Sequence, residues 1–156
     1  MYFKNIIMAS GIMGIGDIIA QKYDNNSLDL KRSAKMAVLG GFSNGLCLTY
    51  WYRFIDKAFY RQKHVIIKKI VADQFIYSPL SILFFLGVTS KQLGSFDEYR
   101  KRCDNNFSDI WKADCSVWPA ANYINFKYVP LYRQPVFSSM IDVGWNSYIC
   151  YKTQKK

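Results

Sequence analysis

Residues 36–52 read MAVLGGFSNGLCLTYWY, and residues 74–90 read QFIYSPLSILFFLGVTS. Each stretch runs for 17 residues without a charged side chain. A helix that crosses a bilayer needs about 20 mainly apolar residues, with roughly 17 as the lower limit. Both stretches therefore reach the minimum length of a membrane-spanning helix and favour an integral membrane protein.

Shorter uncharged stretches lie on either side of these two. Asn5–Gly16 and Cys115–Phe126 have 12 residues each, and Val143–Tyr151 has 9. The mean hydropathy of the whole chain, −0.07, is low for a protein that crosses the membrane several times. A compact soluble helical domain is therefore the competing interpretation.

The pattern of apolar residues predicts an all-α fold, because strand signals are weak along the whole chain. The expected helices are residues 4–22, 32–60, 64–94, 97–107, 109–124 and 134–152. We interpret residues 1–156 as a single membrane domain. Its fold would be an integral membrane bundle of about four transmembrane helices, a short helix kinked at Trp118-Pro119, and a surface amphipathic helix.

Local signals support several of these boundaries. The connector Tyr23–Asp29 is rich in turn residues, and Ser95 can cap a charged helix that contains Arg100–Arg102. Prolines divide the last third of the chain; they are Pro119, Pro130 and Pro135.

The chain carries 21 Lys and Arg against 11 Asp and Glu, a net charge of +10. This charge favours anionic partners, either lipid headgroups or nucleic acid. The many aromatic residues among the basic ones fit a membrane interface better, so we expect the lipid bilayer as the partner. Basic residues are spread evenly over the loops, and the positive-inside rule therefore gives no orientation.

The sequence offers little support for enzyme chemistry. The single histidine, His64, sits in a basic loop and cannot build a metal site or a catalytic triad alone. The four cysteines have no CxxC spacing. We therefore assign no catalytic, cofactor-binding or metal-binding residue, expect no cofactor, and identify no small-molecule substrate.

Three acidic residues interrupt apolar helices: Asp17, Asp73 and Asp142. An acid at membrane depth is costly, so its charge must face the bundle interior, pair with a base, or line water. Two interpretations stay open, a pore-lining role and an ion pair that locks helices together. Gln21 lies four residues after Asp17, and Gln74 directly follows Asp73. Both amides could therefore join the same polar network as these acids.

Gly41 and Gly45 form a GxxxG pattern, which lets two helix backbones approach closely. We favour packing inside the chain over assembly of a homo-oligomer, although both remain open.

Several segments together resemble the Mpv-17 and peroxisomal membrane protein family over nearly the whole chain. In the first two thirds they are Gly16-Asp17, Ala20-Gln21, Asp29, Arg32, Gly40, Trp51-Tyr52, Asp56, Lys69, Asp73-Gln74 and Pro79. In the last third they are Trp111, Trp118-Pro119, Asn125-Phe126, Val129-Pro130, Arg133, Trp145 and Tyr148. The segment Lys112-Ala-Asp114 with Val117–Ala121 resembles the Mpv-17-like protein 2 branch most. Thr49 and Asn122 depart from the residues usual in the family.

This resemblance implies a small four-span protein of the mitochondrial inner membrane, with the peroxisomal membrane as the alternative. The branch implies a role in mitochondrial ribosome assembly and translation, with mitochondrial ribosomal subunits as partners. The second hypothesis is a weakly selective channel for small solutes. Besides the acids, amides and glycines above, the pore or helix-packing candidates are Trp118, Pro119, Asn125 and Arg133.

Overall fold

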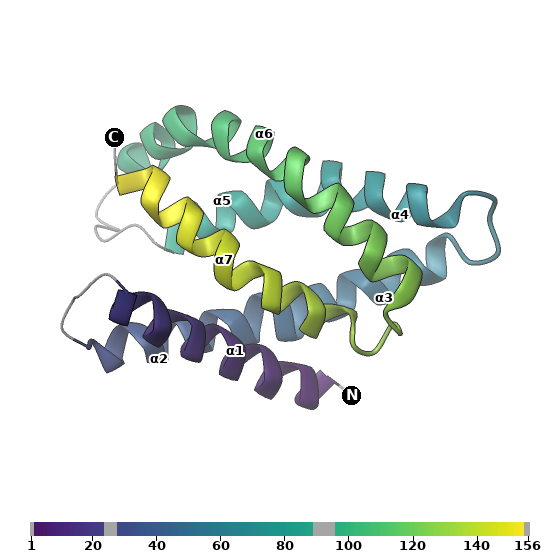
Figure 1. Ribbon diagram of the computed structural model, residues 1–156. Coiled ribbons are helices and arrows are strands. Elements are labelled where there is room, and N and C mark those ends of the chain that lie inside the picture. The colour runs from purple at the N-terminus through teal and green to yellow at the C-terminus, as the bar shows by residue number, and fades with distance from the viewer. Residues whose placement is uncertain (1, 24–27, 89–95, 155–156) are drawn as a thin grey trace. The chain divides into compact units, whose positions relative to one another are not determined.

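The computed structural model describes residues 2–23, 28–88 and 96–154, and every regular element in that part of the chain is a helix (Figure 1). This confirms the predicted all-α fold. The elements are α1 (Tyr2–Tyr23), α2 (Leu30–Gly40), the π-helix η1 (Gly41–Cys47), α3 (Leu48–Ala58), α4 (Val65–Ala72), the π-helix η2 (Asp73–Tyr77), α5 (Ser78–Val88), α6 (Phe96–Tyr128) and α7 (Gln134–Gln154). The expected cap Ser95 lies outside the described residues.

The chain forms two compact units. Unit 1 consists of residues 1–60 and 124–156, and unit 2 consists of residues 61–123. Unit 1 therefore contains α1, α2, η1, α3, α7 and the C-terminal end of α6. Unit 2 contains α4, η2, α5 and the rest of α6.

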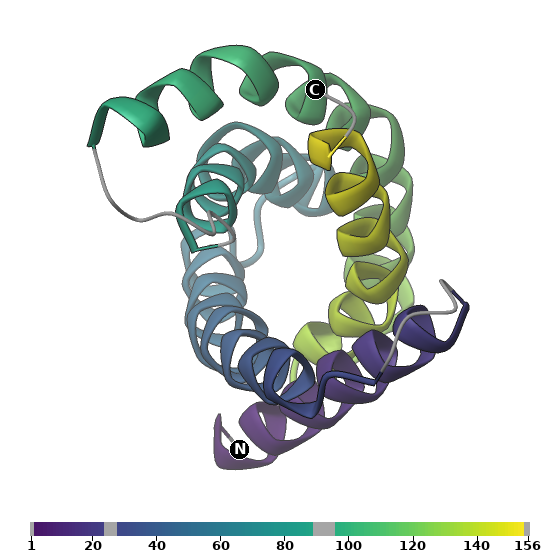
Figure 2. The same cartoon turned by 90° about the vertical axis from the view of Figure 1, so that its left-hand side faces the viewer.

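Helix α1 organises unit 1 through one face. Asn5, Ala9, Met13, Asp17 and Gln21 are all buried, and they recur every four residues, a spacing that places them on the same side of a helix. The helix packs against α2, η1 and α7, and both ribbon views show it lying along α2 (Figures 1 and 2). Five of its large apolar side chains are exposed: Phe3, Ile7, Met8, Ile15 and Ile19.

Two long helices each contain a π-helical turn. The first runs without a break from Leu30 to Ala58, and the second runs from Val65 to Val88. At the ends of the π segments, the Leu48 N–H donates to the Ser43 carbonyl, and the Ser78 N–H donates to that of Asp73. These bonds reach back five residues instead of four. This geometry is rare in proteins as a whole, but where it occurs it is often at a functional site.

The ends of the long helices have local causes. Asp29 Oδ1 accepts a hydrogen bond from the Arg32 backbone N–H at 3.0 Å, so Asp29 is the N-cap of α2. Between α3 and α4, Arg61 and His64 adopt φ values of 55° and 56°. This left-handed conformation is uncommon for residues other than glycine.

In unit 2, α6 runs antiparallel to α5 and η2. Tyr99 Oη donates to the Leu83 carbonyl at 3.2 Å, and Trp111 Nε1 donates to the Gln74 carbonyl at 3.3 Å. The sequence predicted two helices, 97–107 and 109–124, which the structure joins into one helix of 33 residues. No glycine or proline separates the two predicted segments. Pro119 lies inside α6, where it removes one backbone hydrogen bond without ending the helix.

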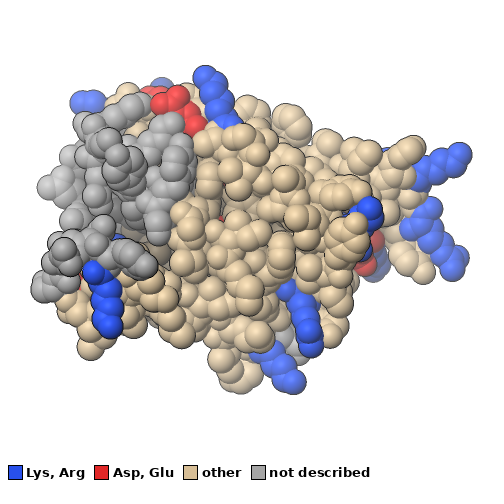
Figure 3. Space-filling model, viewed as in Figure 1, with Lys and Arg blue, Asp and Glu red and all other residues tan. Residues whose placement is uncertain are grey.

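The described residues show an inverted distribution of polarity. Many buried side chains are polar, among them Gln21, Thr49, Gln74, Asn122 and Asn125. Large apolar side chains are exposed in both units, and Figure 3 shows uncharged surface extending between separate Lys and Arg side chains. A soluble domain buries its apolar residues and exposes polar ones. The inverse arrangement fits a bundle whose outer surface faces lipid.

Two of the described helical segments are long and apolar enough to cross a membrane by length and composition, namely Tyr2–Lys22 and Val65–Val88. The stretch 36–52 lies within the continuous helix from Leu30 to Ala58. The total of about four spans stays a prediction.

Candidate functional site

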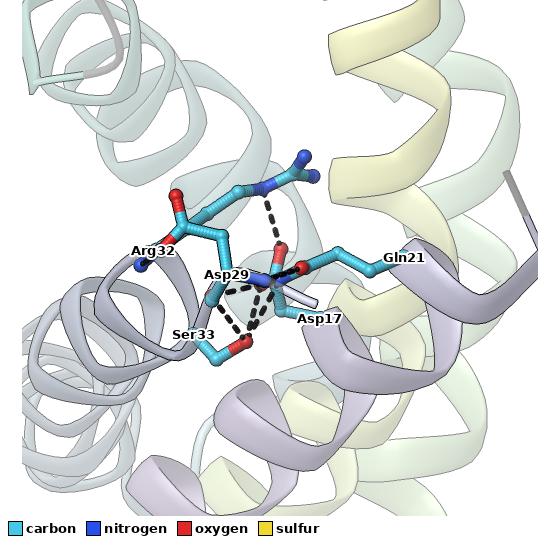
Figure 4. Close-up of polar contacts among 5 residues, drawn as sticks. All are labelled: Asp17, Gln21, Asp29, Arg32 and Ser33. Atoms are coloured by element: carbon cyan, nitrogen blue, oxygen red, sulfur yellow. Dashed lines mark hydrogen bonds and ion pairs between the residues drawn. The ribbon is translucent and has the colours of Figure 1, made fainter. Parts of the chain in front are cut away.

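Asp17 on α1 is the centre of a buried polar cluster in unit 1 (Figure 4). Its Oδ1 lies 3.1 Å from Arg32 Nε on α2. Its Oδ2 accepts hydrogen bonds from Ser33 Oγ at 2.8 Å and from Gln21 Nε2 at 2.6 Å. The Asp29 backbone N–H donates to Gln21 Oε1 at 2.6 Å. This Asp17 cluster ties the end of α1 to the start of α2.

The two charges of the cluster lie in different surroundings. The Asp17 side chain is 5% exposed, whereas the Arg32 side chain is 46% exposed. A buried carboxylate needs an opposite charge and hydrogen-bond donors, and Asp17 has both. The geometry at Asp17 is that of an ion pair joining two helices, one of the two roles considered for this residue.

A second polar contact in unit 1 joins η1 to α7. Asn44 Nδ2 donates to Asp142 Oδ2 at 2.6 Å. Nearby in the chain, Thr49 Oγ1 accepts from Asn5 Nδ2 at 3.1 Å and donates to the Gly45 carbonyl at 2.7 Å. Thr49 therefore keeps a polar role although it departs from the family pattern.

The turn between α6 and α7 is held by the side chains of Asn125 and Gln134, both buried. Asn125 Nδ2 donates to the Gln134 carbonyl at 3.2 Å and to Ser138 Oγ at 3.1 Å. Gln134 Nε2 donates in return to the Val129 carbonyl at 3.0 Å. Ser138 Oγ also lies 2.9 Å from Tyr52 Oη, which links this clamp to α3.

Unit 2 contains its own polar cluster, built from η2, α5 and α6. Asp114 Oδ2 accepts hydrogen bonds from Gln74 Nε2 at 2.5 Å and from Ser78 Oγ at 2.6 Å. Asp73 Oδ2 accepts from Asn122 Nδ2 at 2.6 Å. Asp73 and Gln74 are consecutive in the π-helix, and both are buried. We call Asp114, Gln74 and Ser78 the Asp114 cluster.

Asp114 lies on α6, outside the two helical segments that are long and apolar enough to span a membrane. Burial raises the pKa of the Asp114 carboxyl, and the hydrogen bonds from Ser78 and Gln74 oppose this shift in part.

The GxxxG glycines pack inside unit 1. A Cβ on Gly45 would come 2.5 Å from Ile6 Cα and 2.9 Å from Ile6 N of α1. A Cβ on Gly41 would meet Ser10 Oγ of the same helix. The close approach is therefore between η1 and α1 of one chain, as the sequence favoured. A homo-oligomer stays a prediction.

The remaining candidate residues lie apart from these clusters. Trp118 and Pro119 are half-buried in α6. Arg133 is exposed in the turn before α7, with its guanidinium 5.3 Å from the ring centre of Tyr132.

Sequence reasoning missed two central residues, Asn44 and Asp114. Asn44 stood inside the GxxxG pattern, where only the glycines were considered. Asp114 was named only as part of the segment that resembles the Mpv-17-like protein 2 branch. A usable signal was present for Asn44, which lies one helical turn from the buried glycines Gly40 and Gly41. Asp114 lies about two turns from the nearest buried polar residues of α6, Asn106 and Asn122.

The described residues contain no group of three His, Cys, Asp or Glu side chains that could hold a metal ion. What the fold and the clusters define is an all-α membrane protein whose interior is polar and whose outer surface is apolar.

Comparisons with known proteins identify the family. The model of the Mpv17 / PMP22 family matches residues 91–150. Protein sym-1 of Neurospora crassa is 30% identical over 152 residues, 93% of this chain and 87% of the relative. PXMP2/4 family protein 2 of Dictyostelium discoideum is 32% identical over 154 residues, 90% and 78%. Mitochondrial inner membrane protein Mpv17 of Danio rerio is 30% identical over 156 residues, 96% and 88%. No solved structure matches the chain.

The chain belongs to the Mpv17 / PMP22 family. Relatives named for the mitochondrial inner membrane match almost its whole length, and this places the protein in that membrane. Both findings confirm what the resemblance implied.

Proposed function

We propose that the protein is a non-enzymatic channel that passes small polar solutes across the mitochondrial inner membrane. One observation carries the proposal: polar side chains are buried in both units, while large apolar ones are exposed. A path for polar solutes through lipid needs an interior of this kind, with hydrogen-bonding groups along it.

The acids Asp17, Asp73 and Asp142 are the candidates for the lining of the path. Each accepts a hydrogen bond from a neighbouring helix, so each carboxylate faces another helix of its own unit. Arg32 offsets part of the Asp17 charge, and the remaining negative charge of the three acids would attract cations and repel anions in a pore.

Single-channel recording on the purified chain in planar bilayers tests this proposal. We expect discrete conductance steps. In a salt gradient, we expect Asp17→Asn, Asp73→Asn and Asp142→Asn together to shift the reversal potential toward the equilibrium potential of the anion. Asp104→Asn, which removes an exposed acid of α6, is the matched control. A silent bilayer, or selectivity unmoved by the triple substitution in a variant of normal helix content, would contradict the proposal.

A second candidate function is support of mitochondrial ribosome assembly and translation. It is favoured by the exposed basic segment of unit 2 that contains Arg61, Lys63, His64 and Lys68. Exposed bases of this kind contact phosphate groups of RNA or acidic protein surfaces. A membrane protein with such a loop could hold an assembly intermediate at the membrane.

Gradient sedimentation of mitochondrial ribosomal subunits separates the two functions. In cells depleted of the protein, we expect a reduced large-subunit peak if the second function holds. The peak should return with the unmodified chain but not with Arg61→Gln, Lys63→Gln and Lys68→Gln combined. An unchanged profile after depletion would remove this candidate and leave the channel.

A further inference from the structure

Asp114 and Asp17 are both buried, but their partners differ, because Asp17 pairs with Arg32 whereas the hydrogen bonds to Asp114 come from neutral groups. The Asp114 residue is 3% exposed. Its carboxyl accepts these hydrogen bonds from Gln74 and Ser78. A buried carboxylate without an opposite charge is costly, and such a group takes up a cation or a proton when one is within reach.

Gln74 supplies an independent observation at the same place. The residue is 5% exposed, and its Oε1 has no hydrogen-bond partner, although its Nε2 lies 2.5 Å from Asp114 Oδ2. Oε1 and Nε2 are bonded to the same carbon, so the unpartnered oxygen lies beside the same carboxyl group. A buried acceptor without a donor is destabilising. The cluster therefore contains an unpaired negative charge and an unpaired acceptor side by side.

We propose that Asp114 is a proton-binding site of unit 2, in which the protonated carboxyl donates to Gln74 Oε1. One proton from water joins the carboxylate to give the neutral acid, and no other bond is made or broken. The acid and the carboxamide then share two hydrogen bonds, Nε2–H to Oδ2 and Oδ1–H to Oε1. The proton removes the buried charge and satisfies the amide oxygen in one step, and it closes α6 against η2. The inference does not depend on conduction.

The charged and titratable groups around this site come from three elements. In η2, Asp73 is held by Asn122 of α6. In α4, Lys69 is buried one turn before Asp73. On α6, Lys112 is exposed, and Cys115 Sγ lies 3.3 Å from Gln74 Nε2. Helix α5 carries no charged residue. The hydrogen bonds from Ser78 and Gln74 oppose the effect of burial on the Asp114 carboxyl in part.

Unfolding of the full chain in detergent micelles between about pH 5 and 9 tests the site, because the folded state would hold one more proton than the unfolded state. An exposed Asp ionises near pH 3.9. The unfolding equilibrium constant should therefore rise up to tenfold per pH unit, until the folded Asp114 ionises. Asp114→Asn offers Gln74 a carboxamide of the same shape, and it should fold and lack this one-proton dependence. Asp17→Asn is the matched control, and it should retain the dependence.

Infrared difference spectroscopy reads the proton directly. At neutral pH the unmodified chain should show the carbonyl stretch of a protonated carboxyl, sensitive to deuterium and missing in Asp114→Asn. Absence of this band in the unmodified chain, or equal pH profiles for the two proteins, would overturn the proposal. If Asp114→Asn does not fold, the band of the unmodified chain and its loss on raising the pH decide alone. Stabilisation by Na⁺ or K⁺ relative to choline at fixed ionic strength, abolished by Asp114→Asn, would also overturn it, because a metal ion would be the occupant.

Discussion

The ion pair of the Asp17 cluster shows how burial decides the cost of losing one charge. Asp17 lies almost wholly inside unit 1, while half of the Arg32 side chain is in contact with solvent. If the arginine is removed, a carboxylate stays buried without an opposite charge. If the aspartate is neutralised, the arginine is left in a place where water can solvate it. The two substitutions are therefore not equivalent.

We expect Arg32→Gln to lower the free energy of unfolding by roughly 3 kcal/mol or more, the usual cost of an unpaired buried charge. Asp17→Asn should cost only about 1–2 kcal/mol, because its amide can still accept the hydrogen bonds of Ser33 and Gln21. Equilibrium unfolding in mixed micelles measures both. Equal costs, or a larger cost for Asp17→Asn, would show that the pair is not the main compensation for the Asp17 charge.

Gly45 is constrained by backbone atoms of α1. An added methyl group would come 2.5 Å from Ile6 Cα, and a backbone cannot move aside as a side chain can. We expect Gly45→Ala to separate η1 from α1 and to lower the free energy of unfolding by about 2 kcal/mol or more. Gly11→Ala is the matched control in α1, because a Cβ there has no neighbour within 4 Å. The same melting curve for both variants would argue against the close packing of η1 on α1.

The residues of the polar interior were predictable to different degrees. Asp17, Asp73 and Asp142 stood out, since an acid within an apolar stretch is conspicuous in any sequence. Their partners did not, because Ser33 and Asn122 are uncharged and are joined to the acids only by the packing of helices. Asn44 was hidden by the glycines around it. Partner choice depends on which helix faces meet, and sequence spacing alone does not give this.

At the scale of elements, the helix boundaries followed from local signals. The turn-rich segment before Asp29 and the basic loop around His64 divide helices in the structure near the predicted positions. The π-helical turns could not be predicted, because a single wider turn leaves no mark in the spacing of apolar residues. In η2, the consecutive residues Asp73 and Gln74 are both buried.

Removal of one residue from η1 tests the role of its extra turn. Deletion of Phe42 should let the backbone close ordinary i→i−4 bonds. A π-helical turn holds about one residue more than an α-helical turn, so this deletion should keep the orientation of everything after it. Thr49 and Tyr52 of α3 would then stay in the interior, where both are buried now. We expect the deletion variant to fold and to lose about 1–3 kcal/mol of stability, through the contacts of η1 alone. Phe42→Ala, which removes a half-exposed side chain without changing the register, should cost about 1 kcal/mol.

Circular dichroism and gel filtration in detergent would compare the two variants. A deletion variant that folds, with a melting temperature close to that of Phe42→Ala, would mean that the helix absorbs the lost residue within η1. A deletion variant that does not fold would mean that the wider turn itself is needed to place the buried faces of α2 and α3.

At the scale of the whole molecule, the amino-acid composition did not indicate that polar side chains are buried and large apolar ones are exposed. The mean hydropathy of −0.07 is that of an ordinary soluble protein. The average is low because buried polar residues and many charged residues, several of them along α6, offset the apolar stretches. The individual uncharged stretches gave the correct class of protein, whereas the average over the chain left a soluble domain as a competitor. Family resemblance then decided between the two.

Charged substitutions at exposed apolar positions should distinguish a lipid-facing surface from a water-facing one. Ile15 is 60% exposed near the middle of Tyr2–Lys22, and Ile76 is 52% exposed near the middle of Val65–Val88. In a soluble protein, lysine at such a surface position changes stability by about 0.5 kcal/mol or less. At the centre of a bilayer it costs about 2.5–3.5 kcal/mol.

We therefore expect Ile15→Lys and Ile76→Lys to reduce membrane insertion, measured as resistance to carbonate extraction after synthesis with mitochondria. Phe3→Lys, at the end of the first segment, should insert normally, because a lysine there reaches the headgroups. If all three variants remained in the carbonate pellet in equal amounts, the exposed apolar faces of α1 and η2 would not be the lipid-facing surfaces of the protein.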